Sequence, residues 1–253
     1  THSLSSFNWI INDSLISSNE NFIHTFSYPG LFDVSLIAFD QVGFSDTSVY
    51  QSLVQIDTLY GDIDWDAEVT DNDASLVLSH ITGDELLSPL QQVTGDASNS
   101  ASLSAFDASL ILQFIFGNLD AIPIVNSDSF IANGDLYNPE ILGEVGEIVA
   151  IPISIENSNN LFSFTISFTY NKMQLESGSV YLGTISDYGF LVESSVSDSG
   201  SIIVSGASPT SIDGDLDLFT MYFIPTEFEN GQLEIECNQI MLNEVMQQQS
   251  FSI

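Results

Sequence analysis

Hydrophobic and polar residues follow different rhythms in three successive stretches of the chain. In residues 1–56, short apolar runs alternate with Gly, Pro, Asn and Asp. Residues 57–125 hold two similar polar loops, each followed by a helix-forming segment, and residues 126–253 alternate apolar and polar side chains in period two. Period two is typical of strands that bury one face. The pattern predicts a mainly β protein, with two β-sandwich domains at 1–56 and 126–253 separated by a small α-helical module at 57–125.

The first stretch predicts strands joined by turns. Its aromatic and β-branched runs are bounded by turn-forming residues, as in an immunoglobulin-like sandwich. The expected strands lie at 7–11, 22–26, 32–39 and 50–56. His24 lies in the second of these runs without a Cys or another His nearby in sequence. We therefore expect it to be a hydrogen-bonded core residue rather than a catalytic base or a metal ligand.

The last stretch contains the clearest alternation in the chain. Five large apolar residues there are expected on one face of a strand, with Ser and Thr on the other: Phe162, Phe164, Ile166, Phe168 and Tyr170. Further apolar runs lie at 148–155, 180–182, 202–204, 216–224 and 233–242, which together predict eight or nine strands. The aromatic stripe is expected to form sandwich core. The single cysteine, Cys237, lies in such a run and is expected to be a buried, inert thiol.

The middle stretch repeats itself after 34 residues, from Gly61 and again from Gly95. Calcium prefers six to eight oxygen ligands, which a loop of about 12 residues supplies from positions 1, 3, 5, 7, 9 and 12, the seventh through its carbonyl. In the first copy these positions are Asp62, Asp64, Asp66, Glu68, Thr70 and Asp73. Four carboxylates converge in this arrangement, so without a cation they are expected to repel one another and to have raised pKa values.

The second copy offers fewer charges at the same positions. They are Asp96, Ser98, Ser100, Ser102 through its carbonyl, Ser104 and Asp107. With two carboxylates instead of four, this loop is expected to bind calcium weakly or not at all. Position 6, where glycine usually makes the sharp turn, is Ala67 in the first loop and Ala101 in the second. A solvated acidic turn without metal is the alternative for either loop.

The charge balance narrows the classes of function. The chain has 35 acidic residues against one basic residue, Lys172, and a formal net charge of −34. Nucleic acids and anionic membrane surfaces are unsuitable partners, because both are bound through Lys and Arg. No apolar run reaches the length of a membrane span, so membrane insertion is not expected, and because the chain begins at Thr1 in mid-pattern without a signal peptide, we expect a processed or truncated mature fragment. Such an acidic surface relies on salt or bound cations to reduce its self-repulsion, so we expect an extracellular or cell-surface location.

The repeated loops resemble a type I dockerin, a duplicated calcium-loop-helix module that docks into cohesin domains. The resemblance rests on Asp-Ala-Ser-Leu at the start of both helices, Asp73 to Leu76 and Asp107 to Leu110, and on Gly83 and Gly117 at their ends. It implies bound Ca²⁺ and a protein partner. It also implies a docking face, which falls on Asp71, Asn72, Ala105 and Phe106.

The flanking stretches also resemble known families. Residues 1–56 are similar to a PKD domain in their Trp9 to Asp13 spacing, in His24-Thr25-Phe26 and in Pro29-Gly30. The strands that such a domain has first are missing, and are expected upstream or from a neighbouring molecule. Residues 126–253 resemble a cohesin, a jelly-roll-like sandwich, in Val149 to Ile153, in the strand ending at Tyr170-Asn171 and in Leu242-Asn243-Glu244.

These resemblances imply a non-catalytic assembly protein that docks through calcium-dependent contacts. The segment from 120 to 129 spans at most about 33 Å, so the module is not expected to close on the sandwich of its own chain. Docking between copies, head to tail, would give rings or filaments. Docking of foreign partners is the alternative for assembly. The alternative function is that of a carbohydrate-binding or adhesion fragment, in which Trp9 and Trp65 stack on sugar rings. An enzyme is not expected, because the three predicted domains leave no stretch for a catalytic domain.

Overall fold

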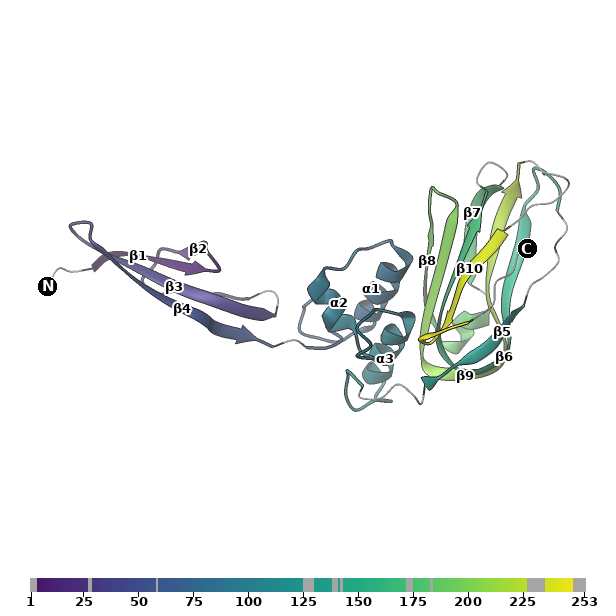
Figure 1. Ribbon diagram of the computed structural model, residues 1–253, viewed down its shortest axis with the longest axis horizontal. Coiled ribbons are helices and arrows are strands. Elements are labelled where there is room, and N and C mark those ends of the chain that lie inside the picture. Colours follow the sequence, from purple (N-terminus) through teal and green to yellow (C-terminus); the bar gives the residue numbers. More distant parts are fainter. Residues whose placement is uncertain are drawn as a thin grey trace. The chain divides into compact units, whose positions relative to one another are not determined.

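The computed structural model describes residues 4–26, 29–57, 59–124, 130–137, 141, 143–171, 175–182, 184–226 and 235–247. The chain divides into two compact units, Thr1–Leu59 and Tyr60–Ile253 (Figure 1). Antiparallel strands dominate both units, and the helices follow β4 and precede β5 in sequence. The predicted mainly β class is therefore confirmed. The boundary expected at 125/126 lies inside the second unit. None of the described helices is long and apolar enough to cross a membrane.

The described residues of the first unit form one antiparallel sheet of four strands. In chain order these are β1 (Leu4–Ile11), β2 (Ser14–Ser17), β3 (Gly30–Asp40) and β4 (Ser45–Ile56), and their order in the sheet is β2-β1-β3-β4. Asn12 and Asp13 join β1 to β2 with φ values of 44° and 65°. Asn and Asp tolerate this left-handed backbone, which a two-residue hairpin of type I′ requires.

The prediction of a strand at 22–26 is wrong, because this segment is irregular in the structure. Its aromatic side chains serve packing instead: Phe22 and Phe26 lie against the small core of Ile11, Phe32 and Val34. The prediction of a core His24 is also wrong. Its ring is exposed and packs edge-on against Phe26, with ring centroids 4.7 Å apart.

Three helices open the second unit: α1 (Asp71–Thr82), α2 (Pro89–Gly95) and α3 (Ala105–Ile115). Thr70, Ser88 and Ser104 occupy their N-cap positions. Gly83 ends α1 with φ 87°, and Gly117 follows the end of α3 with φ 75°. Left-handed glycine after the last helical turn is a common way to stop a helix. We call residues 60–124 the helix module.

The remaining strands of the second unit form a sheet of seven strands that folds over on itself. They are β5 (Asn133–Tyr137), β6 (Val149–Tyr170), β7 (Leu175–Leu182), β8 (Leu191–Val196), β9 (Ser201–Pro225), β10 (Ile235–Leu242) and β11 (Val245–Met246), with a 3-10 helix at Thr184–Tyr188. The order is β11-β10-β6-β9-β7, with β5 paired to β6 and β8 paired to β9. Seven described strands replace the expected eight or nine, because β6 and β9 each join two predicted runs.

The long strands β6 and β9 run through both layers of this sandwich. Val149 to Ile155 pair with Leu216 to Phe223 in one layer, and Ser163 to Thr169 pair with Ser201 to Ala207 in the other. The layers pack together through aromatic contacts, such as Phe168 with Phe219 at a centroid distance of 6.3 Å. Cys237 is 2% exposed in this core, and burial raises the pKa of its thiol to about 11, as expected for an inert residue.

One residue of the predicted aromatic stripe lies outside the sandwich core. The β6–β9 register shifts between Leu161 and Ser163. A bulge of this kind places two consecutive residues on one side of the strand. Phe162 therefore packs with Phe130 and the helix module, whereas Phe164, Ile166, Phe168 and Tyr170 point into the core.

The helix module packs on the outer face of the sandwich layer that contains β8, β9 and β6 (Figure 1). The expectation that the module would not close on its own chain is therefore wrong. The chain needs no long crossing after α3, because it runs back along the module, where the Ile124 N–H donates to the Ala97 carbonyl at 2.8 Å. Phe130 then lies against Phe106 of α3, with ring centroids 5.2 Å apart.

Candidate functional site

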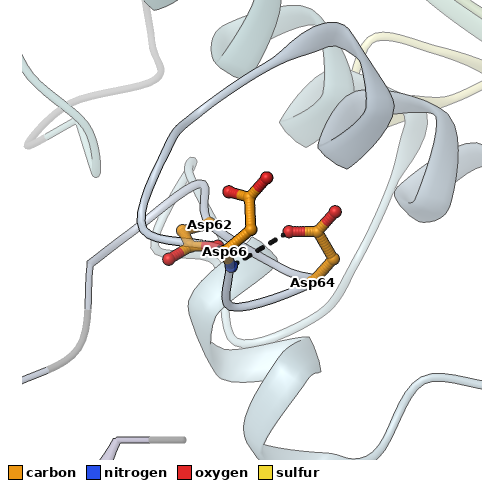
Figure 2. A group of neighbouring side chains, drawn as sticks. All are labelled: Asp62, Asp64 and Asp66. Atoms are coloured by element: carbon orange, nitrogen blue, oxygen red, sulfur yellow. Dashed lines mark hydrogen bonds between the residues drawn. The ribbon is translucent and has the colours of Figure 1, made fainter. Parts of the chain in front are cut away.

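The first acidic loop brings three of its predicted ligands together. Carboxylate oxygens of Asp62, Asp64 and Asp66 all lie within 4.8 Å of one another (Figure 2). Asp62 is 6% exposed, and the Asp64 and Asp66 side chains are exposed. Hard oxygen donors at this separation suit a cation such as calcium. The donor set of the loop thus fits the ion that the resemblance implies.

Backbone amides hold this loop in a tight curl. Asp62 accepts N–H groups from Asp66 at 3.1 Å and from Ala67 at 3.1 Å. Ala67 has φ 74°, and the equivalent Ala101 of the second loop has φ 70°. Both alanines therefore adopt the left-handed backbone that position 6 requires, although this conformation costs an alanine about 1–2 kcal/mol. Burial, and then the charge of Asp73, raise the pKa of Asp62.

The remaining predicted ligands of the first loop lie at its closing end. Asp73 is fully buried, and its two oxygens accept the N–H groups of Ile63 at 2.7 Å and Thr70 at 2.8 Å. Thr70 also donates its hydroxyl to Asp73 at 3.3 Å. Glu68 is exposed and its N–H donates to Asp66 at 2.9 Å. The structure thus groups Asp62, Asp64 and Asp66, while Asp73 ties the loop to α1.

The second loop repeats most of these hydrogen bonds 34 residues later. Asp96 accepts N–H groups from Ser100 at 3.0 Å and Ala101 at 2.9 Å, as Asp62 does in the first loop. Asp107 accepts N–H groups from Ser98 at 2.8 Å and Ser104 at 2.8 Å, and it is fully buried. The Ser100 hydroxyl donates to the Ser102 carbonyl at 3.0 Å. The two loops therefore share one architecture despite their different charge.

An additional carboxylate reaches the second loop from the sandwich. The Ser98 hydroxyl donates to Glu244 of the β10–β11 turn at 2.6 Å. Burial raises the pKa of Asp107 to about 7, and the negative charge of Glu244 contributes to this rise. Sequence reasoning noticed Leu242-Asn243-Glu244 as a motif of the sandwich. It missed the contact, since nothing local indicates that this turn meets a loop 146 positions away.

The two repeats contact the sandwich through equivalent serines. Ser75 of α1 and Ser109 of α3 occupy the same position in the repeat. The Ser75 hydroxyl donates to Glu193 of β8 at 2.8 Å, and the Ser109 hydroxyl donates to the Ser208 carbonyl of β9 at 2.7 Å. Ala207 of β9 is fully buried in the hydrophobic cluster of the helix module. Both helices therefore present the same face to one side of the sandwich.

The four residues of the implied docking face have different surroundings. Ala105 and Phe106 are buried in the cluster of the helix module, and Phe106 contacts Phe130. Asp71 and Asn72 are exposed, and Asn72 donates its side-chain N–H to Asp64 at 2.8 Å. Of this set, Phe106 thus reaches the segment that leads into the sandwich, whereas Asn72 supports the first loop.

The raised pKa of Asp107 predicts how pH affects the calcium-free protein. A buried acid whose pKa rises from 3.8 to about 7 binds its proton more tightly in the folded than in the unfolded chain. In EDTA, we expect the free energy of unfolding to fall as pH rises between these values. Denaturation at a series of pH values measures this slope. An Asp107→Asn variant should lose this component of the slope, and an unchanged slope would contradict the assignment.

The tryptophans give little support to a sugar platform. Trp9 packs against Phe22 with ring centroids 5.3 Å apart, and its indole N–H donates to the Asn19 carbonyl at 3.1 Å. Trp65 lies in the first loop with φ 62° and is partly buried. Trp9 thus serves the packing of its own unit, and Trp65 belongs to the curl of the acidic loop.

No protein-family model and no curated protein matches the chain. Among solved structures, it is similar to a cohesin module of a Clostridium perfringens family 33 glycoside hydrolase, with 16% identity, TM-score 0.39, and coverage of 49% of this chain and 96% of that one. A non-cellulosomal cohesin from Archaeoglobus fulgidus has 24% identity, TM-score 0.33, and coverage of 40% and 71%. A type I cohesin–dockerin complex from Clostridium thermocellum has 16% identity, TM-score 0.36, and coverage of 45% and 87%.

Proposed function

We propose that this chain is a non-catalytic, extracellular docking protein. Its helix module binds the outer face of a cohesin-like sandwich, and calcium in the first loop fixes the shape of the module. The observation that carries the proposal is the paired contact of Ser75 and Ser109, equivalent residues of the two repeats, with β8 and β9. A duplicated module that uses both copies against one sheet face has the form of a docking element.

The contact surface has the mixed character of a docking interface. Apolar contacts of Ala207, Phe162 and Leu191 with the helix module lie beside direct hydrogen bonds. Among these, Asn118 donates its side-chain N–H to the Pro209 carbonyl at 2.9 Å. Interfaces that form and separate combine an apolar centre with polar contacts in this way. Both halves of the contact are therefore suited to pair with a partner as well as with each other.

The same two surfaces can pair within one chain or between copies. When the module of one copy occupies the sandwich of the next, the contact is heterologous and builds rings or open filaments. The strongly acidic surface, with a net charge of −34, favours assembly in the presence of cations, which screen repulsion between copies. A calcium-rich, saline exterior suits such a protein, and a foreign protein that carries one of the two surfaces is the alternative partner.

Mixing two complementary variants tests docking between copies. Ala207→Arg blocks the sandwich surface and leaves the module intact, whereas Ser109→Arg blocks the module and leaves the sandwich surface intact. Each variant alone should remain monomeric in calcium. An equimolar mixture should form a 1:1 dimer, because the free module of one chain then meets the free sandwich of the other.

Light scattering coupled to size exclusion measures the masses. The dimer should dissociate in EDTA if calcium shapes the module. A mixture that stays monomeric at high protein concentration in calcium would contradict docking between copies. Near-UV circular dichroism of each variant checks that the sandwich core and the module are still folded.

A further inference from the structure

The hydroxyl side chains of β6 extend from beneath the helix module to its rim. They alternate with the core residues of the strand and therefore lie on the outer face of the sandwich. Their burial decreases along the strand: Ser163 is fully buried, Thr165 is 5% exposed, Ser167 is partly buried and Thr169 is exposed. The module thus covers one end of this hydroxyl row and leaves the other end open.

A cavity of about 470 Å³ lies at this rim, between the helix module and the sandwich. Thr165, Ser167 and Gln239 line its sandwich side, and His80 and Gln92 line its module side. Gln239 and Ser167 are paired across β10 and β6, so their side chains lie on the same face. The volume falls within the range of small-molecule sites, roughly 300–1,000 Å³. Both walls are needed to enclose the cavity, so the site exists only while the module is docked.

Charge is missing from the cavity although the chain is strongly acidic. None of the described residues that line it is Asp, Glu, Lys or Arg, whereas the whole chain contains 35 acidic residues. A carboxylate or phosphate group would find no Arg or Lys to pair with, and an ammonium group or metal ion would find no carboxylate. The net charge of −34 also repels anions from the protein. These features favour a ligand without net charge.

The polar side chains of the cavity retain donors and acceptors for such a ligand. The Leu87 N–H donates to Nδ1 of His80 at 3.1 Å, so the ring proton lies on Nε2, which is left as a donor. Gln92 donates its side-chain N–H to the Leu87 carbonyl at 2.9 Å, which leaves its side-chain oxygen as an acceptor. Within the described part of the chain, the Ser167 hydroxyl and the Gln239 side-chain amide have no hydrogen-bond partner. Hydrogen-bonding groups are therefore available on both walls.

Apolar side chains complete the lining. Ile81 of α1, Leu103 of the second loop and Ile203 of β9 are partly buried and border the same cavity. A purely apolar ligand would leave the hydroxyl and amide groups without partners, which is unfavourable in a partly buried site. A saccharide matches the mixture, because its ring carries hydroxyl groups around its edge and C–H groups on its faces.

We infer that this cavity binds a neutral saccharide. Side-chain amides and hydroxyls contact the hydroxyl groups of the sugar, and the three apolar side chains contact its C–H groups. The sugar binds the docked state only, because one wall belongs to the helix module and the other to the sandwich. A ligand that binds only one of two states shifts the equilibrium toward that state. The inference thus uses the docking contact of the proposed function and adds a ligand that strengthens it.

Titration of the full chain with sugars tests the inference. Maltose, cellobiose and lactose are the neutral probes, glucuronate is the anionic probe, and a capped trialanine peptide represents a neutral peptide. Isothermal titration calorimetry should detect binding of at least one of the three disaccharides. Glucuronate and the peptide should bind more weakly than that disaccharide or not at all.

Two matched double variants locate the binding site. Ser167→Ala/Gln239→Leu removes two hydrogen-bonding groups from the sandwich wall and should weaken the binding of that disaccharide at least tenfold. The control, Thr169→Ala/Asn238→Leu, removes the same kinds of group from exposed neighbouring positions on β6 and β10 and should leave the affinity unchanged. Thermal unfolding without sugar checks that both variants are folded.

Three results would overturn the inference. They are the absence of binding for all three disaccharides at millimolar concentration, unchanged affinity in Ser167→Ala/Gln239→Leu, and tighter binding of the peptide or of glucuronate than of any disaccharide. Ala207→Arg supplies a second measurement. Once an increased radius of gyration shows that its module has left the sandwich, it should bind the sugar at least tenfold more weakly, and unchanged affinity in that state also overturns the inference. The mass measurement on the mixed variants contains no sugar, so a failure of docking between copies is recognised separately.

Discussion

Replacement of Ala207 by Arg is expected to release the helix module from the sandwich. Ala207 is fully buried and faces the helices, whereas Gly206 faces the core, where an added Cβ would lie 2.5 Å from the ring of Phe164. An arginine at this fully buried position has to be accommodated among the apolar side chains of the helix module. A buried charge without compensation costs about 3–5 kcal/mol, so the docked state is expected to be strongly disfavoured.

Small-angle X-ray scattering and hydrogen exchange measure the release. The radius of gyration should increase, and exchange should accelerate in α1 and α3 because they lose their contacts with β8 and β9. The matched control is Thr169→Arg, an exposed position of β6 in the same sandwich layer that pairs with Ser201. An unchanged radius and unchanged exchange in Ala207→Arg would contradict the interface described above.

Removal of two carboxylates from the first loop is expected to abolish most of its calcium binding. Asp64→Asn/Asp66→Asn keeps the size of both side chains and removes two of the three charges that lie within 4.8 Å of one another. We expect the calcium affinity of this loop to fall at least a hundredfold. At a calcium concentration of about 100 times the parental dissociation constant, the parent gains about 2.7 kcal/mol, and the variant should lose most of this gain.

Thermal unfolding with calcium and with EDTA measures the difference. Asp46→Asn/Asp57→Asn makes the same change of charge in or just after strand β4 of the first unit, and it should keep the full calcium-dependent rise in Tm. If both double variants respond to calcium as the parent does, the ion binds elsewhere. If the parent itself shows no rise, the loops are acidic turns without a structural ion.

The repeated loops were predictable because residues close together in sequence determine their conformation. The spacing of Asp62, Asp64 and Asp66 determines which oxygens meet within one turn of chain, and the cap residues Thr70 and Ser104 lie directly beside it. The structure groups these three aspartates and gives both alanines at position 6 a positive φ. Strand periodicity also located most of the core of the second unit.

The packing of the helix module on the sandwich was not predictable in the same way. It depends on contacts between distant residues, such as Ser98 with Glu244 and Ser109 with Ser208. The bulge that turns Phe162 out of the core has no signature in an otherwise regular alternation. The length of the link argued against closure, but length limits only the reach of a chain and does not indicate which surfaces lie beside each other.

The shared strands β6 and β9 also determine how the sandwich can fold. Their ladder begins where Thr169 meets Ser201, close in sequence, and ends where Val149 meets Phe223. Pairing that starts at Thr169 and Ser201 closes the shorter loop and therefore loses less chain entropy. The second layer can then form by extending this ladder in the same register toward Val149 and Phe223. The layer that carries the helix module is thus expected to form first, so that the docking surface exists before the rest of the sandwich closes.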